Sequence, residues 1–233
     1  MCKYGLRIRL LTKIKKEVTI ISRRTGFTID EERVHTWTHL LGVIFILIAG
    51  PLLLSYAPLG SRMFLSILIY VATFLAVFGA SSRYHSSKQD KEKDLYRKID
   101  HIAIYFFIAG SNTPYLLGFS DYKFAWIFLV VMWVLVMIGV VYKWFGMNWP
   151  DWISLVYYLL MGWLGVVTVY IIFDQINPIT FALLVLGGIL YTIGTFFYRK
   201  DFIKWYHSIW HVFVLLAAIA HYAALSFQLS VSM

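Results

Sequence analysis

The sequence predicts an all-α integral membrane protein, folded as a bundle of seven transmembrane helices. Three observations support this prediction: the composition, the spacing of the apolar segments and the distribution of the basic residues. Of the 233 residues, 60% are hydrophobic and only 14% are charged, whereas roughly a quarter of the residues of a soluble domain are charged. This imbalance indicates a chain that lies mostly in lipid.

Seven apolar segments are each long enough to cross a bilayer, which requires about 20 helical residues. Short polar or proline- and glycine-marked breaks separate them. Ten-residue alternating strands are absent from the sequence, and helices satisfy the backbone polar groups of such long spans in lipid. The predicted spans are 35–56, 62–85, 98–117, 122–143, 151–171, 178–198 and 205–227.

The connections between the spans are too short to hold a soluble domain. We therefore predict one transmembrane domain over 31–233, preceded by a basic arm over 1–30. The arm lacks a continuous apolar core and a small-residue cleavage site, which argues against a signal peptide. It suits contact with the anionic inner leaflet, and a basic tail that only fixes topology is the alternative. Thr28 and Glu31 have the spacing of a capping box at the start of the first helix.

The 21 lysines and arginines predict the orientation of the bundle. Nine precede the first span, six surround the connection between spans two and three, one follows span four, and three join spans six and seven. Only Arg62 and Lys123 remain for the other side. The positive-inside rule then places the N-terminus in the cytoplasm and the C-terminus outside the cell membrane. The net charge of +9 is therefore a topology signal and does not indicate a nucleic-acid partner.

Polar residues gather at the predicted cytoplasmic ends of four spans. Ionisable groups within lipid are costly, so each needs a partner or a purpose. The polar residues at these span ends are His39, Ser81, His85, Asp100, His101, His207 and His211. For His101 alone, and for His221 deeper in the seventh span, a hydrogen-bonded packing role is the simpler interpretation. His35 lies at the membrane edge, where we expect it to be solvated.

The spacing of the histidines points to a metal site. The lone Cys2 cannot form a thiolate cluster, so a metal must be held by histidine and carboxylate groups. His207 and His211 are four residues apart and share a helical face, as two zinc ligands on one helix do. His85 would complete three nitrogen ligands and leave a fourth position for water, the arrangement of a catalytic zinc ion.

Such a centre predicts metal-dependent hydrolysis. One Zn²⁺ ion would lower the pKa of its bound water to about 7. Asp100 would position that water or accept its proton, and Ser81 would hydrogen-bond the water or the ligand. A site of this kind beside the bilayer suits a membrane lipid amide or ester as substrate. A chain of aspartate and histidine residues is also what a proton relay needs, so transport stays open.

Four motifs then carry a resemblance to a known family: EERVHTWTHLLG (31–42), SSRYH (81–85), KIDHIAIYFFIAGSNTPY (98–115) and HSIWHVFVLLAAIAHY (207–222). In their order and spacing the chain resembles the bacterial hemolysin III branch of the progestin and adipoQ receptor family, which includes the adiponectin receptors. The resemblance covers roughly 30–225. One departure is that His35 and Thr36 stand where the first motif usually has asparagine followed by serine.

The resemblance implies a seven-helix fold with a cytoplasmic N-terminus. It also implies a zinc ion held by His85, His207 and His211 near the cytoplasmic face, with Asp100 and Ser81 at the positions of the family's aspartate and serine. Similarity of that site to alkaline ceramidases implies zinc-dependent hydrolysis of a lipid amide.

Three other functions compete with hydrolysis. The first is a non-enzymatic regulator or sensor of membrane lipid state, in which zinc is structural. The second is the cytolysin that the family name suggests, which we rank low because a seven-span protein without a secretory signal cannot readily travel in soluble form. The third is an ion or proton transporter. His221 lies about 21 Å along the predicted helix from His207, so it is too far away to reach the metal.

Overall fold

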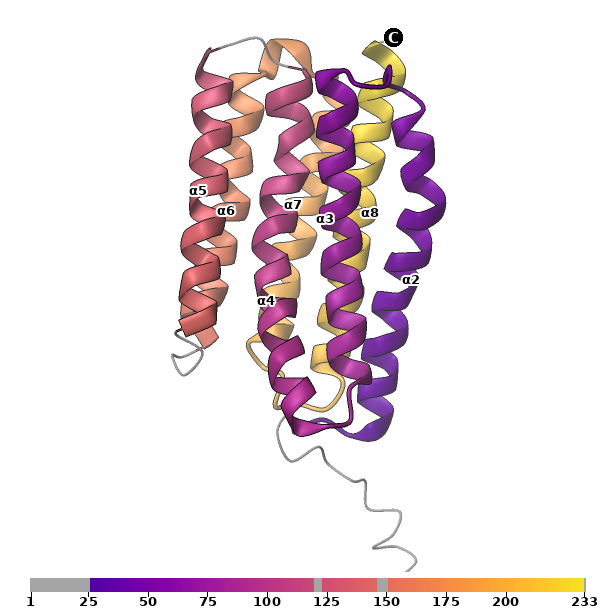
Figure 1. The fold of residues 1–233 in the computed structure, drawn as a ribbon, viewed down its shortest axis with the longest axis vertical. Helices are drawn as coiled ribbons and strands as arrows, with labels where there is room; N and C mark the ends of the chain where they lie inside the picture. Colours follow the sequence, from indigo (N-terminus) through magenta and orange to yellow (C-terminus); the bar gives the residue numbers. More distant parts are fainter. Residues whose placement is uncertain (1–25, 120–122, 146–150, 233) are drawn as a thin grey trace, which may run out of the picture.

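The computed structural model describes residues 26–119, 123–145 and 151–232. Most of the predicted basic arm therefore lies outside the described residues. A π-helix (Pro114–Gly118) and a 3₁₀-helix (Phe173–Gln175) accompany the long α-helices, and the described chain is all-helical, as predicted. The long helices are α2 (Ile29–Leu54), α3 (Arg62–Ser86), α4 (Asp90–Thr113), α5 (Lys123–Phe145), α6 (Asp151–Ile171), α7 (Pro178–Tyr198) and α8 (Tyr206–Ser232), and they run side by side along the molecule (Figure 1).

Within the described ranges, six of these helices are long and apolar enough to cross a membrane, and α4 is the exception. The chain is therefore a multi-pass membrane protein. The third predicted span, 98–117, corresponds to the later part of α4 and the π-helix that follows it. α4 begins at Asp90, earlier than that span, because a charged stretch rich in lysine and aspartate is helical before the apolar part starts.

The first helix begins at Ile29, six residues before the predicted span, because of its N-terminal cap. The Thr28 hydroxyl accepts the Glu31 N–H at 3.2 Å, and the Glu31 carboxylate accepts the Thr28 N–H at 2.9 Å. This reciprocal pair confirms the predicted capping box and satisfies donors that a helix start leaves open.

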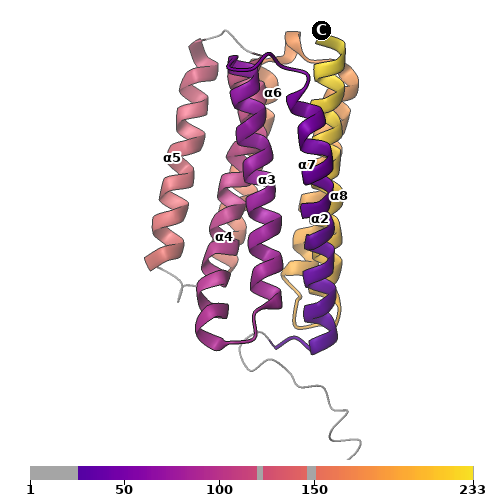
Figure 2. The same cartoon turned by 45° about the vertical axis from the view of Figure 1, so that its right-hand side comes forward.

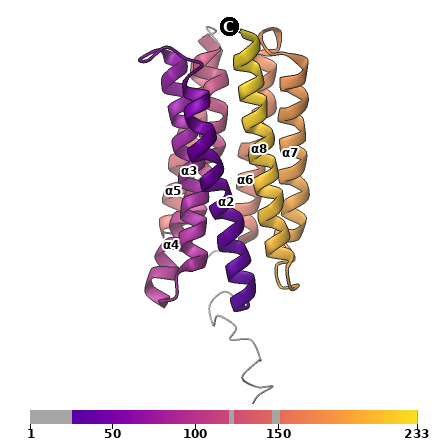
Figure 3. The ribbon, with the colours of Figure 1, turned by 90° about the vertical axis from the view of Figure 1, so that its right-hand side faces the viewer.

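Three chain segments meet at one end of the bundle. The starts of α2 and α8 and the connection from α3 to α4 lie at that end, and the C-terminus lies at the other (Figure 1). α5 stands at the margin of the bundle, as the turned view makes clear (Figure 2). α8 packs between α2 and α7 (Figure 3). The fold thus brings early α2, late α3 and early α8 together.

The centre of the bundle is an aromatic core between α3 and α4. Phe74 stacks on Phe78 with ring centroids 4.7 Å apart, and Phe107 of α4 meets Phe74 edge-on at 5.2 Å. The two helices approach closely at Gly110, where an added Cβ would overlap the Thr73 side chain. Small residues commonly permit such close approach of helices in membranes.

We expect Gly110→Ala to destabilise the bundle by about 1–3 kcal/mol, because the added methyl group must displace Thr73 in a packed core. Gly79→Ala is the matched control, since a Cβ at Gly79 meets no other atom within 4 Å. Thermal unfolding in detergent measures both. Equal melting temperatures for the two variants would show that the α3–α4 contact is looser than described.

Candidate metal centre

Four imidazoles from three helices gather at the end of the bundle where α2 and α8 begin. His35 belongs to α2, His85 to the end of α3, and His207 and His211 to the start of α8. The six distances between their ring centroids fall between 4.7 and 5.5 Å. Six nearly equal distances describe a tetrahedron, so the four rings enclose one common space.

The nitrogen atoms of this cluster can reach a single ion. One ring nitrogen from each of His35, His85 and His207 lies within 4.8 Å of the other two, and the three could hold a metal ion. Nitrogen ligands of a tetrahedral zinc ion are about 3.4 Å apart, because each Zn–N bond is about 2.0–2.1 Å. A small inward movement of the rings would therefore complete the site.

Buried nitrogens without hydrogen-bond partners also fit a metal-binding role. Both ring nitrogens of His35 and Nδ1 of His207 are buried and have no hydrogen-bond partner among the described residues. Most buried side-chain polar atoms in proteins are hydrogen-bonded. The donor set therefore fits a metal ion that prefers nitrogen ligands.

Glu32 orients the ring of His85. Its Oε2 accepts a hydrogen bond from His85 Nδ1 at 2.7 Å, and its Oε1 accepts one from Lys93 Nζ at 2.7 Å. This bond leaves Nε2 of His85 as the nitrogen that can bind a metal. A carboxylate behind a histidine ligand fixes its tautomer and raises its basicity, and here it also ties α2, α3 and α4 together.

Glu31 holds the start of α8 against α2. Its Oε1 accepts the backbone N–H of Trp205 at 2.8 Å. Trp205 has a φ of 69°, in the left-handed region that bulky residues rarely adopt. Strained backbone of this kind persists where its surroundings hold it in place, and it is concentrated at functional sites. The contact holds His207, two residues further along the chain, close to α2, where its ring lies 4.8 Å from the His35 ring.

Thr38 and Phe27 complete the surroundings of the cluster. The Thr38 hydroxyl donates to the backbone carbonyls of its own helix, and its oxygen lies 3.4 Å from His211 Nδ1. His39 meets the His211 ring edge-on at 4.1 Å. The buried Phe27 ring lies 4.6 Å from the His207 ring and 4.9 Å from the His35 ring, so it packs directly against the cluster.

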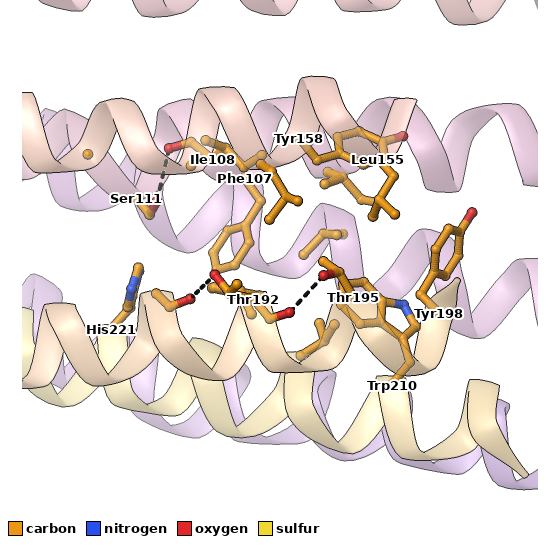
Figure 4. A pocket seen from close by; sticks show the side chains of 18 of the residues that line it. Phe107, Ile108, Ser111, Leu155, Tyr158, Thr192, Thr195, Tyr198, Trp210 and His221 are labelled. Carbon is orange, nitrogen blue, oxygen red and sulfur yellow. Dashed lines mark hydrogen bonds between the residues drawn. The ribbon is translucent and has the colours of Figure 1, made fainter. Parts of the chain in front are cut away.

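A cavity of about 480 Å³ adjoins the cluster and extends through the bundle. Figure 4 shows part of its wall, with Tyr198 and Trp210 near one end and His221 near the other. The hydroxyls of Thr192 and Thr195 donate to the backbone of their own helix, so they leave this stretch of wall largely apolar. The cavity is the size of a site for a small ligand or part of a lipid.

The predicted catalytic residues face the same cavity. Ser81 and Asp100 line the cavity together with His207 and His211. The cavity also reaches the outer surface of the bundle between α6 and α7. Residues of both helices line it and are exposed outside: Trp163, Val166, Phe181 and Val185.

The structure places the three predicted ligands, His85, His207 and His211, in one cluster, and their binding of a metal stays a prediction. The expectation that His35 is solvated is wrong, because His35 is fully buried beneath Phe27. Sequence reasoning also missed Glu32. Glu32, His35 and His39 are spaced three and four residues apart and therefore share one helical face. This spacing could have indicated that Glu32 and His35 belong to the site.

His221 and His101 lie apart from this cluster. His221 packs on Gly187 and meets the Tyr191 ring edge-on at 5.7 Å. This agrees with the predicted interior packing role. His101 is buried on α4, and its backbone carbonyl accepts the Tyr158 hydroxyl at 3.0 Å.

Comparison with known proteins identifies similar chains. The family model described as "Haemolysin-III related" matches residues 27–222. A hemolysin-3 homolog from Bacillus subtilis (strain 168) is 37% identical over 203 residues, covering 86% of this chain and 95% of that protein. Hemolysin-3 from Bacillus cereus is 31% identical over 197 residues, covering 84% and 90%. The human monocyte to macrophage differentiation factor is 29% identical over 167 residues, covering 67% of each chain.

We expect the purified protein to bind one equivalent of zinc, and His85→Ala to lose most of it because the remaining nitrogens cannot close around the ion. His221→Ala, which changes a histidine far from the cluster, should keep its zinc. Metal analysis after gel filtration measures both. Retention of zinc by His85→Ala would place the metal elsewhere.

We expect Glu32→Gln to weaken zinc affinity by about 10- to 100-fold, the usual cost of losing a carboxylate behind a histidine ligand. Competition with a chromophoric chelator measures the change. Glu92→Gln is the control, since Glu92 pairs with Arg83 on the exposed surface at 3.2 Å. An equal loss in both variants would mean that Glu32 acts only through general electrostatics.

Proposed function

This chain belongs to the haemolysin-III related family, and we propose that it is a metal-dependent hydrolase of a membrane lipid amide or ester. One observation carries the proposal. Two histidines of the cluster (His207 and His211), the side chains of Ser81 and Asp100, and an apolar path to the outer surface between α6 and α7 lie along one cavity. A hydrolase that takes its substrate from the bilayer needs these three elements together.

The donor set favours zinc as the metal. Imidazole nitrogens suit zinc, copper, iron and nickel, whereas magnesium and manganese prefer carboxylate and carbonyl oxygens. His85, His207 and His211 would hold the ion, with Glu32 fixing the first of them. A zinc ion at this position would supply Lewis-acid chemistry, polarising a carbonyl group and acidifying a water molecule.

Asp100 would transfer the proton during hydrolysis, and Ser81 would position Asp100. Ser81 lies one helical turn before His85 on the same face, which places its hydroxyl on the histidine side of α3. Asp100 lines the same cavity, and a hydrogen bond from the Ser81 hydroxyl would hold its carboxylate in place. Asp100 would then accept the proton of the attacking water and return it to the leaving amine or alkoxide, as a general base and acid does.

The cavity would select the substrate. Its walls are mostly apolar, so they suit an acyl or alkyl chain, while the polar group to be cleaved would lie at the histidine end. The exposed lining residues of α6 and α7 mark a side entrance at the level of the lipid chains. A lipid could therefore enter without leaving the membrane.

A second function has its own observation. His35 adds a fourth imidazole to the cluster, and zinc sites closed by four protein ligands are typically structural. A regulator of membrane lipid state, in which zinc only ties the helices together, is the function that this observation favours.

We expect Asp100→Asn to reduce lipid hydrolysis by about 100-fold or more, because a positioned general base contributes that much to catalysis. Its zinc content should stay unchanged. Mass spectrometry of products from a lipid mixture in nanodiscs measures the activity, and a chelator should abolish it in the wild-type protein. Zinc-loaded protein that yields no product from any lipid would favour the regulator instead.

We expect Gly188→Leu to block hydrolysis while leaving zinc bound, because Gly188 lines the cavity and a Cβ there meets no atom within 4 Å. The leucine side chain would occupy space needed by the lipid. Gly79→Leu is the control, as its Cβ position is equally open but lies outside the cavity. Equal activities of the two variants would show that the substrate does not bind in this cavity.

A further inference from the structure

His35 is the imidazole that the three-histidine site leaves without a role. Its side chain is fully buried, and neither Nδ1 nor Nε2 has a hydrogen-bond partner among the described residues. A neutral imidazole carries one donor and one acceptor, and leaving a buried donor or acceptor without a partner costs free energy. A ring enclosed in this way therefore requires a partner that the neighbouring side chains do not supply.

The nearby carboxylates are already engaged. The oxygens of Glu31 accept the N–H groups of Thr28 and Trp205. Those of Glu32 accept hydrogen bonds from His85 and Lys93. These bonds use the carboxylate groups to hold helix ends and another imidazole, and neither carboxylate makes a hydrogen bond to the His35 ring.

The ring neighbours of His35 are equally informative. Phe27 meets it edge-on at 4.9 Å and offers no polar atom. The other ring contacts in the described part of the chain are His85, His207 and His211, at centroid distances of 4.7, 4.8 and 4.7 Å. His35 is thus equidistant from all three predicted ligands, whereas His39 makes such a contact with His211 alone among them.

From this position we infer that His35 is a fourth ligand, so that the resting centre is a closed four-histidine site for a divalent cation. The inference rests on the metal site proposed above and concerns its coordination. The ligand atoms of His35, His85 and His207 already lie within 4.8 Å of one another, and His211 completes the tetrahedron of rings. Four neutral nitrogens suit a tetrahedral zinc ion.

A closed centre changes how the site works. Three protein ligands leave a position for water, and four do not. Hydrolysis then requires the His35 ring to withdraw before water can take its place. The His35 ring lies under Phe27, so displacement of the Phe27 side chain would be coupled to the withdrawal of His35. His35 therefore controls access of water and substrate to the metal.

X-ray absorption spectroscopy at the zinc edge tests the inference on the purified full-length chain. The wild-type spectrum should fit four imidazole ligands. His35→Asn should fit three imidazoles with an oxygen ligand in the vacant position, and its zinc should pass to a chelator at least about tenfold faster, as expected when a ligand interaction is lost. His221→Asn should match the wild-type protein in both measurements.

The outcomes separate the two proposals. Three imidazoles and one oxygen in the wild-type protein would overturn the role of His35 and leave the three-histidine hydrolase intact. Absence of zinc from the wild-type protein would overturn both. Because the wild-type spectrum alone counts the ligands, the test gives an answer even if His35→Asn does not fold.

Discussion

The burial of four imidazoles in one small space is the constraint on which the rest of this end of the bundle depends. Without a cation, several buried nitrogens lack partners, and each costs free energy. Several contacts in the fold nevertheless hold these imidazoles together. The capping box at Thr28, the bond from Trp205 to Glu31 and the Glu32 bridge between His85 and Lys93 all position the elements that carry the rings. A bound metal would supply the partners that these buried nitrogens lack.

The long apolar helices could be predicted from the sequence because hydropathy and length decide them almost alone. The start of α7 matched at Pro178, where a proline follows its Asn177 cap, whereas α4 began earlier than its lipid-compatible part. The meeting of His85, His207 and His211 could be predicted from helix ends and i, i+4 spacing. Burial of His35 could not, because it depends on Phe27 folding back over the start of α2. The bridge from Glu32 to Lys93 joins residues 61 positions apart, and no local pattern encodes it.

The site combines a histidine cluster that could hold a metal ion with an apolar cavity, and this combination restricts the possible chemistry more than either part does. A structural metal alone needs no cavity beside it, and a lipid-binding cavity alone needs no buried histidines. Ser81 and Asp100 line the cavity together with His207 and His211 of the cluster. For the proposed hydrolase, the number of histidine ligands at rest would decide whether water can bind the metal directly or only after one ligand has moved away.

The position of a bound metal would show whether the histidine cluster is its site. Anomalous diffraction from crystals of the full-length protein, collected at the zinc edge, would show where the ion lies. We expect a single peak inside the tetrahedron of His35, His85, His207 and His211, beside the cavity that Asp100 lines. A peak elsewhere in the bundle, or none in protein purified without chelators, would contradict it.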